Sequence, residues 1–128
     1  MSQENKQIIE KVNNAFIEGN SEGFLEQCAE DVVWVMEGDQ SFKGVTAIRE
    51  FMSQMEGSEP PKFTVDKVVA EGDAVICYGT MSMSSPKEAA GDYSYCDAYT
   101  LSNGKITELR SFVVKHKTED EKSGTAAG

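Results

Sequence analysis

Residues 93–114 decide the fold and read Tyr93-Ser-Tyr-Cys-Asp-Ala-Tyr-Thr-Leu-Ser-Asn-Gly-Lys-Ile-Thr-Glu-Leu-Arg-Ser-Phe-Val-Val114. Apolar and polar side chains alternate on both sides of Asn103-Gly104, a pattern typical of half-buried strands. Asn-Gly is the strongest short signal for a two-residue hairpin turn, because both residues tolerate a positive φ. The stretch therefore predicts an antiparallel pair of strands over 92–102 and 105–116.

The first strand of the quoted stretch carries one carboxylate between two tyrosines. Asp97 lies two positions from both Tyr95 and Tyr99, so the three side chains share one face of the strand. Burying a carboxylate is costly and needs a reason. Asp97 is therefore the candidate catalytic residue, an acid or base in a pocket. The alternative is a structural acid that accepts hydrogen bonds from a tyrosine hydroxyl or a backbone amide.

The rest of the chain predicts helices first and strands afterwards. Apolar residues recur at helical spacing in two segments, and Ser21 is typical of the N-cap of a third, shorter helix that carries Phe24, Leu25 and Cys28. A loop is expected from Glu37 to Lys43. The expected long helices are 3–18 and 44–55, and the further strands are 32–36, 62–71 and 73–83.

This order predicts an α+β fold, in which three N-terminal helices pack in a curved, mostly antiparallel sheet. A break is expected at Glu59-Pro-Pro61, where two prolines interrupt the pattern. The chain of 128 residues is the usual size of one domain, which we place at 1–117. Residues 118–128 are charged and then small, and are expected to form a disordered tail.

The charge and hydropathy of the chain limit the kinds of partner that it is expected to bind. The formal net charge is −10, which argues against nucleic acid and an anionic membrane, since both select basic surfaces. No apolar run has the length of a membrane span, and the polar N-terminus has no signal-peptide pattern. We therefore predict a cytoplasmic protein.

Cysteine and histidine patterns predict neither disulfides nor a metal site. The chain has three widely spaced cysteines and one histidine, His116. Cys96 should face away from the pocket, and Cys77 should do so if its strand has the usual parity. His116 would have to converge with a serine and Asp97 to form a triad, which strand alternation disfavours. No cofactor is expected.

Three segments together resemble the SnoaL-like and ketosteroid-isomerase-like branch of the NTF2-like superfamily. They are Phe16-Ile-Glu-Gly-Asn-Ser-Glu-Gly-Phe-Leu25, Lys43-Gly-Val-Thr-Ala-Ile-Arg-Glu-Phe51 and Asp97-Ala-Tyr-Thr-Leu-Ser-Asn-Gly-Lys-Ile106. The resemblance covers roughly residues 5–116 and implies a cone-shaped half-barrel with a hydrophobic pocket at one end. It also implies a homodimer. It does not specify a reaction, because the fold hosts isomerases, cyclases, hydrolases, dehydratases and non-catalytic modules.

The resemblance also implies which residues line the pocket. Alternation along the strands turns one face of each inward, and the apolar faces of the first and third helices close the space. The expected lining residues besides Asp97 are Val12, Phe16, Trp34, Met36, Phe51, Tyr95, Tyr99, Leu109, Ser111 and Val113.

Two mechanisms of the superfamily are disfavoured. Of the ketosteroid isomerase groups, only Asp97 is present, at the position of a protonated acid; Met36 replaces the base and Val12 the helical tyrosine. Glu37 would be a backup base only if a bulge turned it inward. The epoxide hydrolase pattern needs a second carboxylate where Ser111 stands. The remaining hypothesis is a proton-transferring isomerase or cyclase on a small apolar carbonyl compound. The alternative is a non-catalytic ligand-binding or association module.

Overall fold

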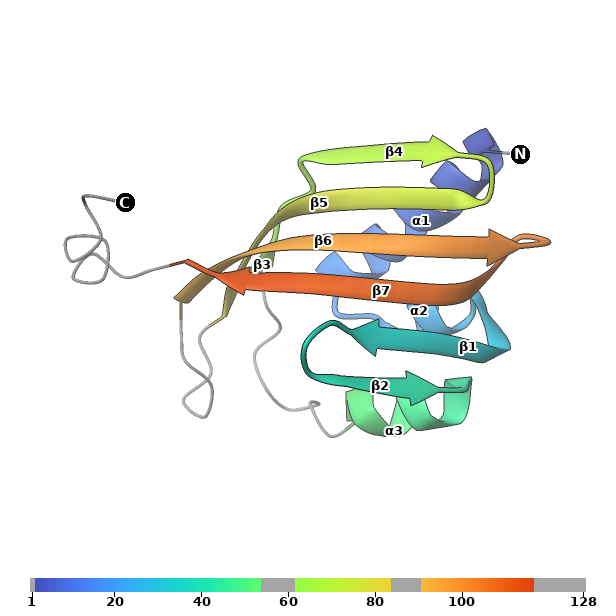
Figure 1. Cartoon of the computed structure of the whole chain (residues 1–128), viewed down its shortest axis with the longest axis horizontal. Coiled ribbons are helices and arrows are strands. Elements are labelled where there is room, and N and C mark those ends of the chain that lie inside the picture. The colour runs from blue at the N-terminus through green and yellow to red at the C-terminus, as the bar shows by residue number, and fades with distance from the viewer. Residues whose placement is uncertain (1, 54–61, 84–90, 117–128) are drawn as a thin grey trace.

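The computed structural model describes residues 2–53, 62–83 and 91–116. In these ranges, helices cover one face of a curved, seven-stranded sheet with the order β2-β1-β7-β6-β5-β3, and β4 also pairs with β5 (Figure 1). The helices are α1 (Ser2–Ile17), α2 (Ser21–Leu25) and α3 (Val45–Ser53). The strands are β1 (Cys28–Met36), β2 (Gln40–Lys43), β3 (Lys62–Phe63), β4 (Lys67–Glu71), β5 (Ala74–Met83), β6 (Gly91–Ser102) and β7 (Lys105–Lys115). The predicted α+β class is confirmed.

The β6–β7 hairpin forms where the sequence predicts it. Asn103 and Gly104 both have a positive φ, 51° and 78°, as a two-residue turn of the primed type requires. The hairpin sets Asp97 opposite Ser111 and Tyr95 opposite Val113. Paired residues of antiparallel strands point to the same face. A bulge between Thr100 and Leu101 shifts the register by one residue, so the turn and the bulge together determine which side chains meet across this pair.

The N-terminal half joins the sheet through a parallel pair. β1 runs parallel to β7, with Trp34 beside Leu109 and Met36 beside Ser111. β2 then pairs antiparallel with the end of β1, so the predicted loop from Glu37 to Lys43 contains a strand. Alternation in so short a segment carries little information, and pairing with β1 decides its conformation.

Two further boundaries differ from the prediction. The N-cap of α2 is Asn20, whose side chain accepts a hydrogen bond from the Gly23 N–H at 3.2 Å, and the helix ends before Cys28, which begins β1. The predicted strand over 62–71 is split into β3 and β4. The break predicted at Glu59-Pro-Pro61 and the tail predicted over 118–128 lie outside the described residues.

The core lies between the helices and the inner face of the sheet. It combines apolar side chains of all three helices with inward-facing side chains of β1, β5, β6 and β7. α1 packs on β4 and β5, and α3 packs on β1 and β2. The fully buried members include Ile9, Val12, Phe24, Val32, Ile48, Val75, Cys77, Tyr99, Leu101, Ile106 and Leu109.

Candidate functional site

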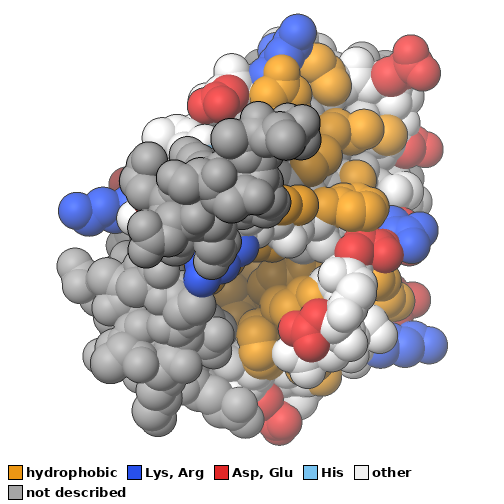
Figure 2. Space-filling view, turned by 60° about the vertical axis from the view of Figure 1, so that its left-hand side comes forward, with side chains coloured by type: hydrophobic (Ala, Val, Ile, Leu, Met, Phe, Trp, Pro, Cys, Tyr) orange, Lys and Arg blue, Asp and Glu red, His pale blue; other side chains and the backbone are white. Residues whose placement is uncertain are grey.

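A cavity of about 410 Å³ opens at the end of the half-barrel where β1 ends. This size is typical of a small-molecule pocket. Figure 2 shows this end of the molecule, with a hollow among hydrophobic side chains and acidic side chains beside it. The lining residues are Trp34, Met36, Glu37, Asp39, Phe63, Met81, Tyr95, Asp97, Ser111 and Val113.

Strand pairing explains why residues from distant parts of the chain meet here. The side chains of Tyr95 and Asp97 on β6 and of Ser111 on β7 point to the inner face, and Asp97 lies opposite Ser111. The parallel β1 adds Met36 next to Ser111. Six of the residues expected from the sequence therefore line one cavity: Trp34, Met36, Tyr95, Asp97, Ser111 and Val113.

Five other expected residues do not line this cavity. Val12, Tyr99 and Leu109 are on the inner side but are completely buried, because the helices pack directly on that part of the sheet. Phe51 packs edge-on against Trp34, with the ring centroids 5.9 Å apart. Phe16 packs against Phe63 at 6.4 Å. These residues support the cavity wall from behind.

Three lining residues, Phe63, Met81 and Asp39, are absent from the sequence-based expectation, and a fourth, Glu37, was expected there only as a backup base turned inward by a bulge. Met81 lies on β5 with the same parity as the inward-facing Cys77. Its inward direction therefore follows from strand alternation once the pairing of β5 with β6 is known. Phe63 lies on a strand of two residues, too short for a periodic pattern. Glu37 and Asp39 belong to the β1–β2 turn, which the sequence analysis treated as part of a loop.

A hydrogen-bonded chain leads to Asp97. The indole Nε1–H of Trp34 donates to the Ser111 hydroxyl oxygen at 3.0 Å. The Ser111 hydroxyl in turn donates to the Asp97 carboxylate. Burial raises the pKa of Asp97 to about 6, and the hydrogen bond from Ser111 opposes part of this rise. Asp97 can therefore exchange a proton near neutral pH.

The tyrosine hydroxyls of this region do not point freely into the cavity. Tyr95 Oη donates to the backbone oxygen of Thr64 at 2.7 Å. Tyr99 Oη is completely buried and has no hydrogen-bond partner among the described residues, and the same holds for Asn13 Nδ2. Neither tyrosine hydroxyl is therefore free to orient a ligand, because that of Tyr95 is already hydrogen-bonded and that of Tyr99 is buried.

Cys77 differs from the sequence-based expectation. It pairs with Asp97 across β5 and β6 and faces the core, where its thiol lies 4.0 Å from Asn13 Oδ1. Burial is the main cause that raises the pKa of Cys77 to about 12, so the thiol stays protonated and unreactive. Cys96 pairs with Phe112, on the opposite face of the sheet, as expected.

Carboxylates at the cavity mouth lie on the β1–β2 turn. Glu37 accepts a hydrogen bond of 2.7 Å from Arg110 Nε, which holds its carboxylate toward β7. Burial at this point is partial, with the Glu37 side chain 27% exposed. Glu37 therefore places an ion-paired carboxylate at the mouth of the cavity.

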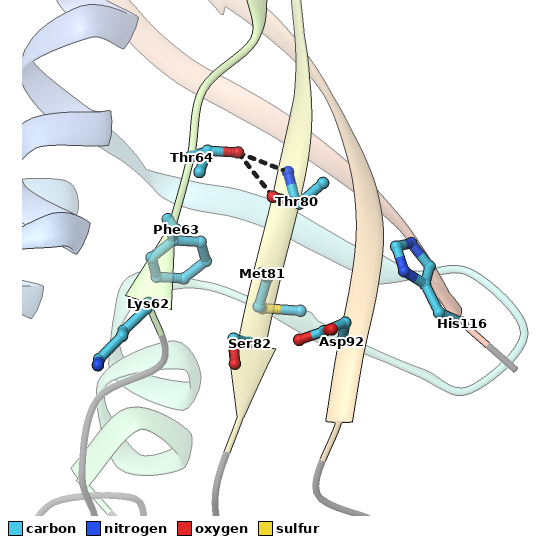
Figure 3. A pocket seen from close by; sticks show the side chains of 8 residues that line it. All are labelled: Lys62, Phe63, Thr64, Thr80, Met81, Ser82, Asp92 and His116. Atoms are coloured by element: carbon cyan, nitrogen blue, oxygen red, sulfur yellow. Dashed lines mark hydrogen bonds between the residues drawn. The ribbon is translucent and has the colours of Figure 1, made fainter. Parts of the chain in front are cut away.

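His116 lies outside the cavity, in a separate surface hollow drawn in Figure 3. Its Nε2 lies 2.7 Å from Ser94 Oγ on β6. In Figure 3 the Asp92 side chain points toward Met81 and Ser82 and away from the imidazole. A serine and the histidine therefore meet, but without an orienting acid and on strand positions of the opposite parity to Asp97.

Nothing in the described ranges resembles a metal centre. Among the described residues, no group of three or more His, Cys, Asp or Glu side chains could hold a metal ion. None of the helices in these ranges combines the length and the apolar character that a bilayer crossing requires.

Several solved structures share this architecture. An LEH-like epoxide hydrolase of M. tuberculosis is 18% identical over 88% of this chain and 84% of its own, with a TM-score of 0.77. A Jannaschia protein designated a SnoaL-like polyketide cyclase is 18% identical over 98% and 92%, with a TM-score of 0.76. A Kribbella flavida protein designated a ketosteroid isomerase is 14% identical over 91% and 82%, with a TM-score of 0.77. At these identities the comparison concerns the fold alone, which is NTF2-like.

The sequence itself identifies the family. The model of the SnoaL-like domain matches residues 9–109. The chain belongs to the SnoaL-like domain family, as the three quoted segments indicate. A sequence comparison with curated proteins finds no match.

Proposed function

We propose that this protein binds a small apolar, cyclic carbonyl compound in the cavity and transfers a proton through Asp97, as an isomerase or a cyclase. The observation that carries the proposal is the position of Asp97. Its carboxyl lies at the wall of the cavity among mostly apolar side chains, with Glu37 and Asp39 on the turn at the mouth, and burial raises its pKa to about 6. A group that titrates near the working pH is suited to both accepting and donating a proton.

The surrounding residues define what Asp97 can do. Above pH 6 its carboxylate can accept a proton from a carbon next to a carbonyl group, which leaves an enolate. The Ser111 hydroxyl stabilises the ionised carboxylate and fixes its orientation, because Trp34 in turn holds Ser111. The protonated Asp97 can then return the proton to another atom of the same ligand. Isomerisation and cyclisation are both compatible with this cycle.

The alternative is a protein that binds an apolar ligand without reaction. It is favoured by one observation: among the described residues lining the cavity, the donors Trp34, Ser111 and Tyr95 already have acceptors. An enolate oxygen would therefore lack the donors that usually stabilise it. In this alternative, affinity survives Asp97→Asn but falls with Trp34→Ala.

Exchange of α-protons for deuterium in a cyclic ketone, 2-tetralone, tests the catalytic proposal. The exchange reports proton abstraction whether the natural reaction is an isomerisation or a cyclisation. We expect the wild type to accelerate exchange in D₂O, with a rate that rises with pH through about pH 6, because Asp97 must be ionised. Asp97→Asn should lower the rate about a hundredfold, the usual contribution of one positioned base. NMR of the ketone gives the rate.

Asp92→Asn is the matched control. Asp92 is an exposed carboxylate on the same strand and does not line the cavity. Its replacement should leave the exchange rate unchanged. Equal rates for the wild type and Asp97→Asn would contradict the catalytic role of Asp97.

We also propose that the protein is a homodimer formed through the outer face of the sheet. The pairing places Val69 of β4 beside Ile76 of β5, and Cys96 of β6 lies between Tyr78 of β5 and Phe112 of β7 on the same outer face. Several of these outward-facing residues are large, apolar and exposed. Contiguous apolar surface of this kind is typical of an interaction site. These residues are Val69, Ile76, Tyr78, Phe112 and Val114.

Phe112→Glu tests this dimer. Phe112 is 45% exposed in the single chain, so the variant should fold normally. A charge at the centre of the proposed interface should convert the dimer to a monomer, which sedimentation velocity detects as a halved mass. Asp92→Asn on the same outer face is the control and should stay dimeric. A wild-type monomer at high concentration would refute the proposal.

A further inference from the structure

The described residues that line the cavity have free hydrogen-bond acceptors, but their donors are already used. On the described lining residues, the Trp34 indole donates to Ser111, the Ser111 hydroxyl donates to Asp97 and the Tyr95 hydroxyl donates to Thr64. Met36, Phe63, Met81 and Val113 offer no donor at all. The described wall of the cavity therefore has no donor left for a ligand.

Acceptor capacity, in contrast, remains unused. A carboxylate has about four lone-pair positions, and Ser111 occupies one of those on Asp97. A carboxylate that is shielded from water needs further donors, since an unsatisfied buried charge is costly. An apolar ligand that covers Asp97 without donating a hydrogen bond would leave this need unmet.

We propose that the ligand presents a hydroxyl group to the Asp97 carboxylate, and that it is a neutral apolar ring compound with a phenol or enol hydroxyl. This inference rests on the proposed function, because it uses the same cavity and the same carboxyl. The enol form of a cyclic carbonyl compound has this hydroxyl. The ring would lie against Trp34, Met36 and Phe63, which provide flat and adaptable apolar surface.

Charge at the site favours a neutral ligand over an anion. Glu37 and Asp39 lie at the mouth, and Arg110 is already paired with Glu37. A carboxylate ligand would meet Asp97 and both of these acids without a free cation among the described lining residues. Burial of a second charge in this apolar cavity would add a desolvation cost that a neutral hydroxyl avoids.

Near neutral pH, the protonation state that changes at this position is that of Asp97 itself. From β5 it faces Cys77, whose pKa burial raises to about 12. On β6 itself, burial also raises the pKa values of Tyr95 and Tyr99, so both stay neutral. From β7 and β1 it meets Ser111 and Trp34, which do not titrate, and Glu37 and Asp39 are at the mouth. Asp97 should accept the ligand hydroxyl when ionised and lose this preference when protonated.

Three naphthalene derivatives of similar size test the inference. 2-Naphthol donates a hydrogen bond, 2-methoxynaphthalene can only accept one, and 2-naphthoate is an anion. Affinities are measured by calorimetry at pH 5 and pH 7.5. The indole N–H resonance of Trp34 shows binding at the site, because the chain contains one tryptophan.

We expect 2-naphthol to bind at least tenfold more tightly than the ether at pH 7.5, the size expected for a hydrogen bond to a charged group. At pH 5 the difference should fall below threefold, because protonated Asp97 can donate to the ether. Asp97→Asn should show less than a threefold difference at both pH values, whereas Asp92→Asn should behave as the wild type. 2-Naphthoate should bind most weakly at pH 7.5.

Three results would overturn the inference: equal affinities of naphthol and ether for the wild type at pH 7.5, a preference that persists in Asp97→Asn, or no binding of any probe. The outcome is separable from that of the ketone exchange. Preference for the hydroxyl without exchange would remove the catalytic proposal and support the ligand class. Exchange without this preference would support the catalytic proposal and remove the proposed ligand class.

Discussion

Asp97→Asn is expected to stabilise the folded protein above pH 6 by about 2 kcal/mol, even though it removes the proposed catalytic group. Burial raises the pKa of Asp97 from 3.8 to about 6, so the folded state binds this proton more tightly than the unfolded state does. The contribution of Asp97 to the free energy of unfolding therefore falls as pH rises through this window and stays low above it. A shift of this size corresponds to about 3 kcal/mol, which we reduce because the side chain lines an open cavity. Asparagine has no charge to bury.

Urea unfolding of the wild type and Asp97→Asn between pH 4 and pH 8 measures this effect. The difference in the free energy of unfolding should be small at pH 4 and should grow until about pH 6. Asp92→Asn should show no such pH-dependent difference, because Asp92 is exposed. If Asp97→Asn is the less stable protein at pH 8, the carboxylate is a satisfied structural acid and its ionised form is not strained in the fold.

Gly79→Ala is expected to destabilise the protein by about 3 kcal/mol. A Cβ at this position of β5 would overlap the backbone oxygen of Thr64 and come within 3.1 Å of Tyr95 Oη. Tyr95 lies opposite Gly79 in the pairing of β5 with β6. The Tyr95 hydroxyl passes over Gly79 and donates a hydrogen bond to the backbone oxygen of Thr64. The backbone after β3 would have to move away, and overpacking of this kind costs about 1–3 kcal/mol, occasionally more. The cavity wall formed by Phe63 would move with it.

Thermal and chemical unfolding of Gly79→Ala give this loss, with Ser82→Ala, an exposed position of the same strand, as the control. The double variant Gly79→Ala/Tyr95→Phe separates the two contacts. Because the main overlap is with the Thr64 backbone, removal of the tyrosine hydroxyl should restore little stability. Wild-type stability of Gly79→Ala would show that the segment after β3 can shift at no cost.

The two variants connect stability with function. Burial that disfavours the ionised form of Asp97, with the loss of stability that we expect from it, is the pattern expected for a functional group rather than a structural one. Gly79 keeps β3 close enough for Tyr95 to bond Thr64, so Phe63 and Tyr95 can form the wall beside Asp97. The ring centroids of these two residues lie 6.0 Å apart, edge to face. Asp97 is the proposed reactive group, and Gly79 determines the shape of the wall beside it.

The sequence by itself determined what depends on neighbouring residues. Alternation put Tyr95 and Asp97 on one face of their strand, helical spacing predicted α1 and α3, and Asn103-Gly104 predicted the turn that joins β6 to β7. The pairing of Asp97 with Ser111 also depends on the bulge between Thr100 and Leu101, which the turn does not predict.

Only the tertiary structure decided what depends on segments far apart in the chain. Trp34 and Ser111, separated by 77 positions, share a hydrogen bond because β1 pairs in parallel with β7. Cys77 faces the core and Met81 the cavity because of the pairing of β5 with β6. Alternation is a local property and states only that neighbouring side chains point to opposite faces. Which face is inner, and which donors are already committed there, depends on long-range pairing that periodicity does not encode.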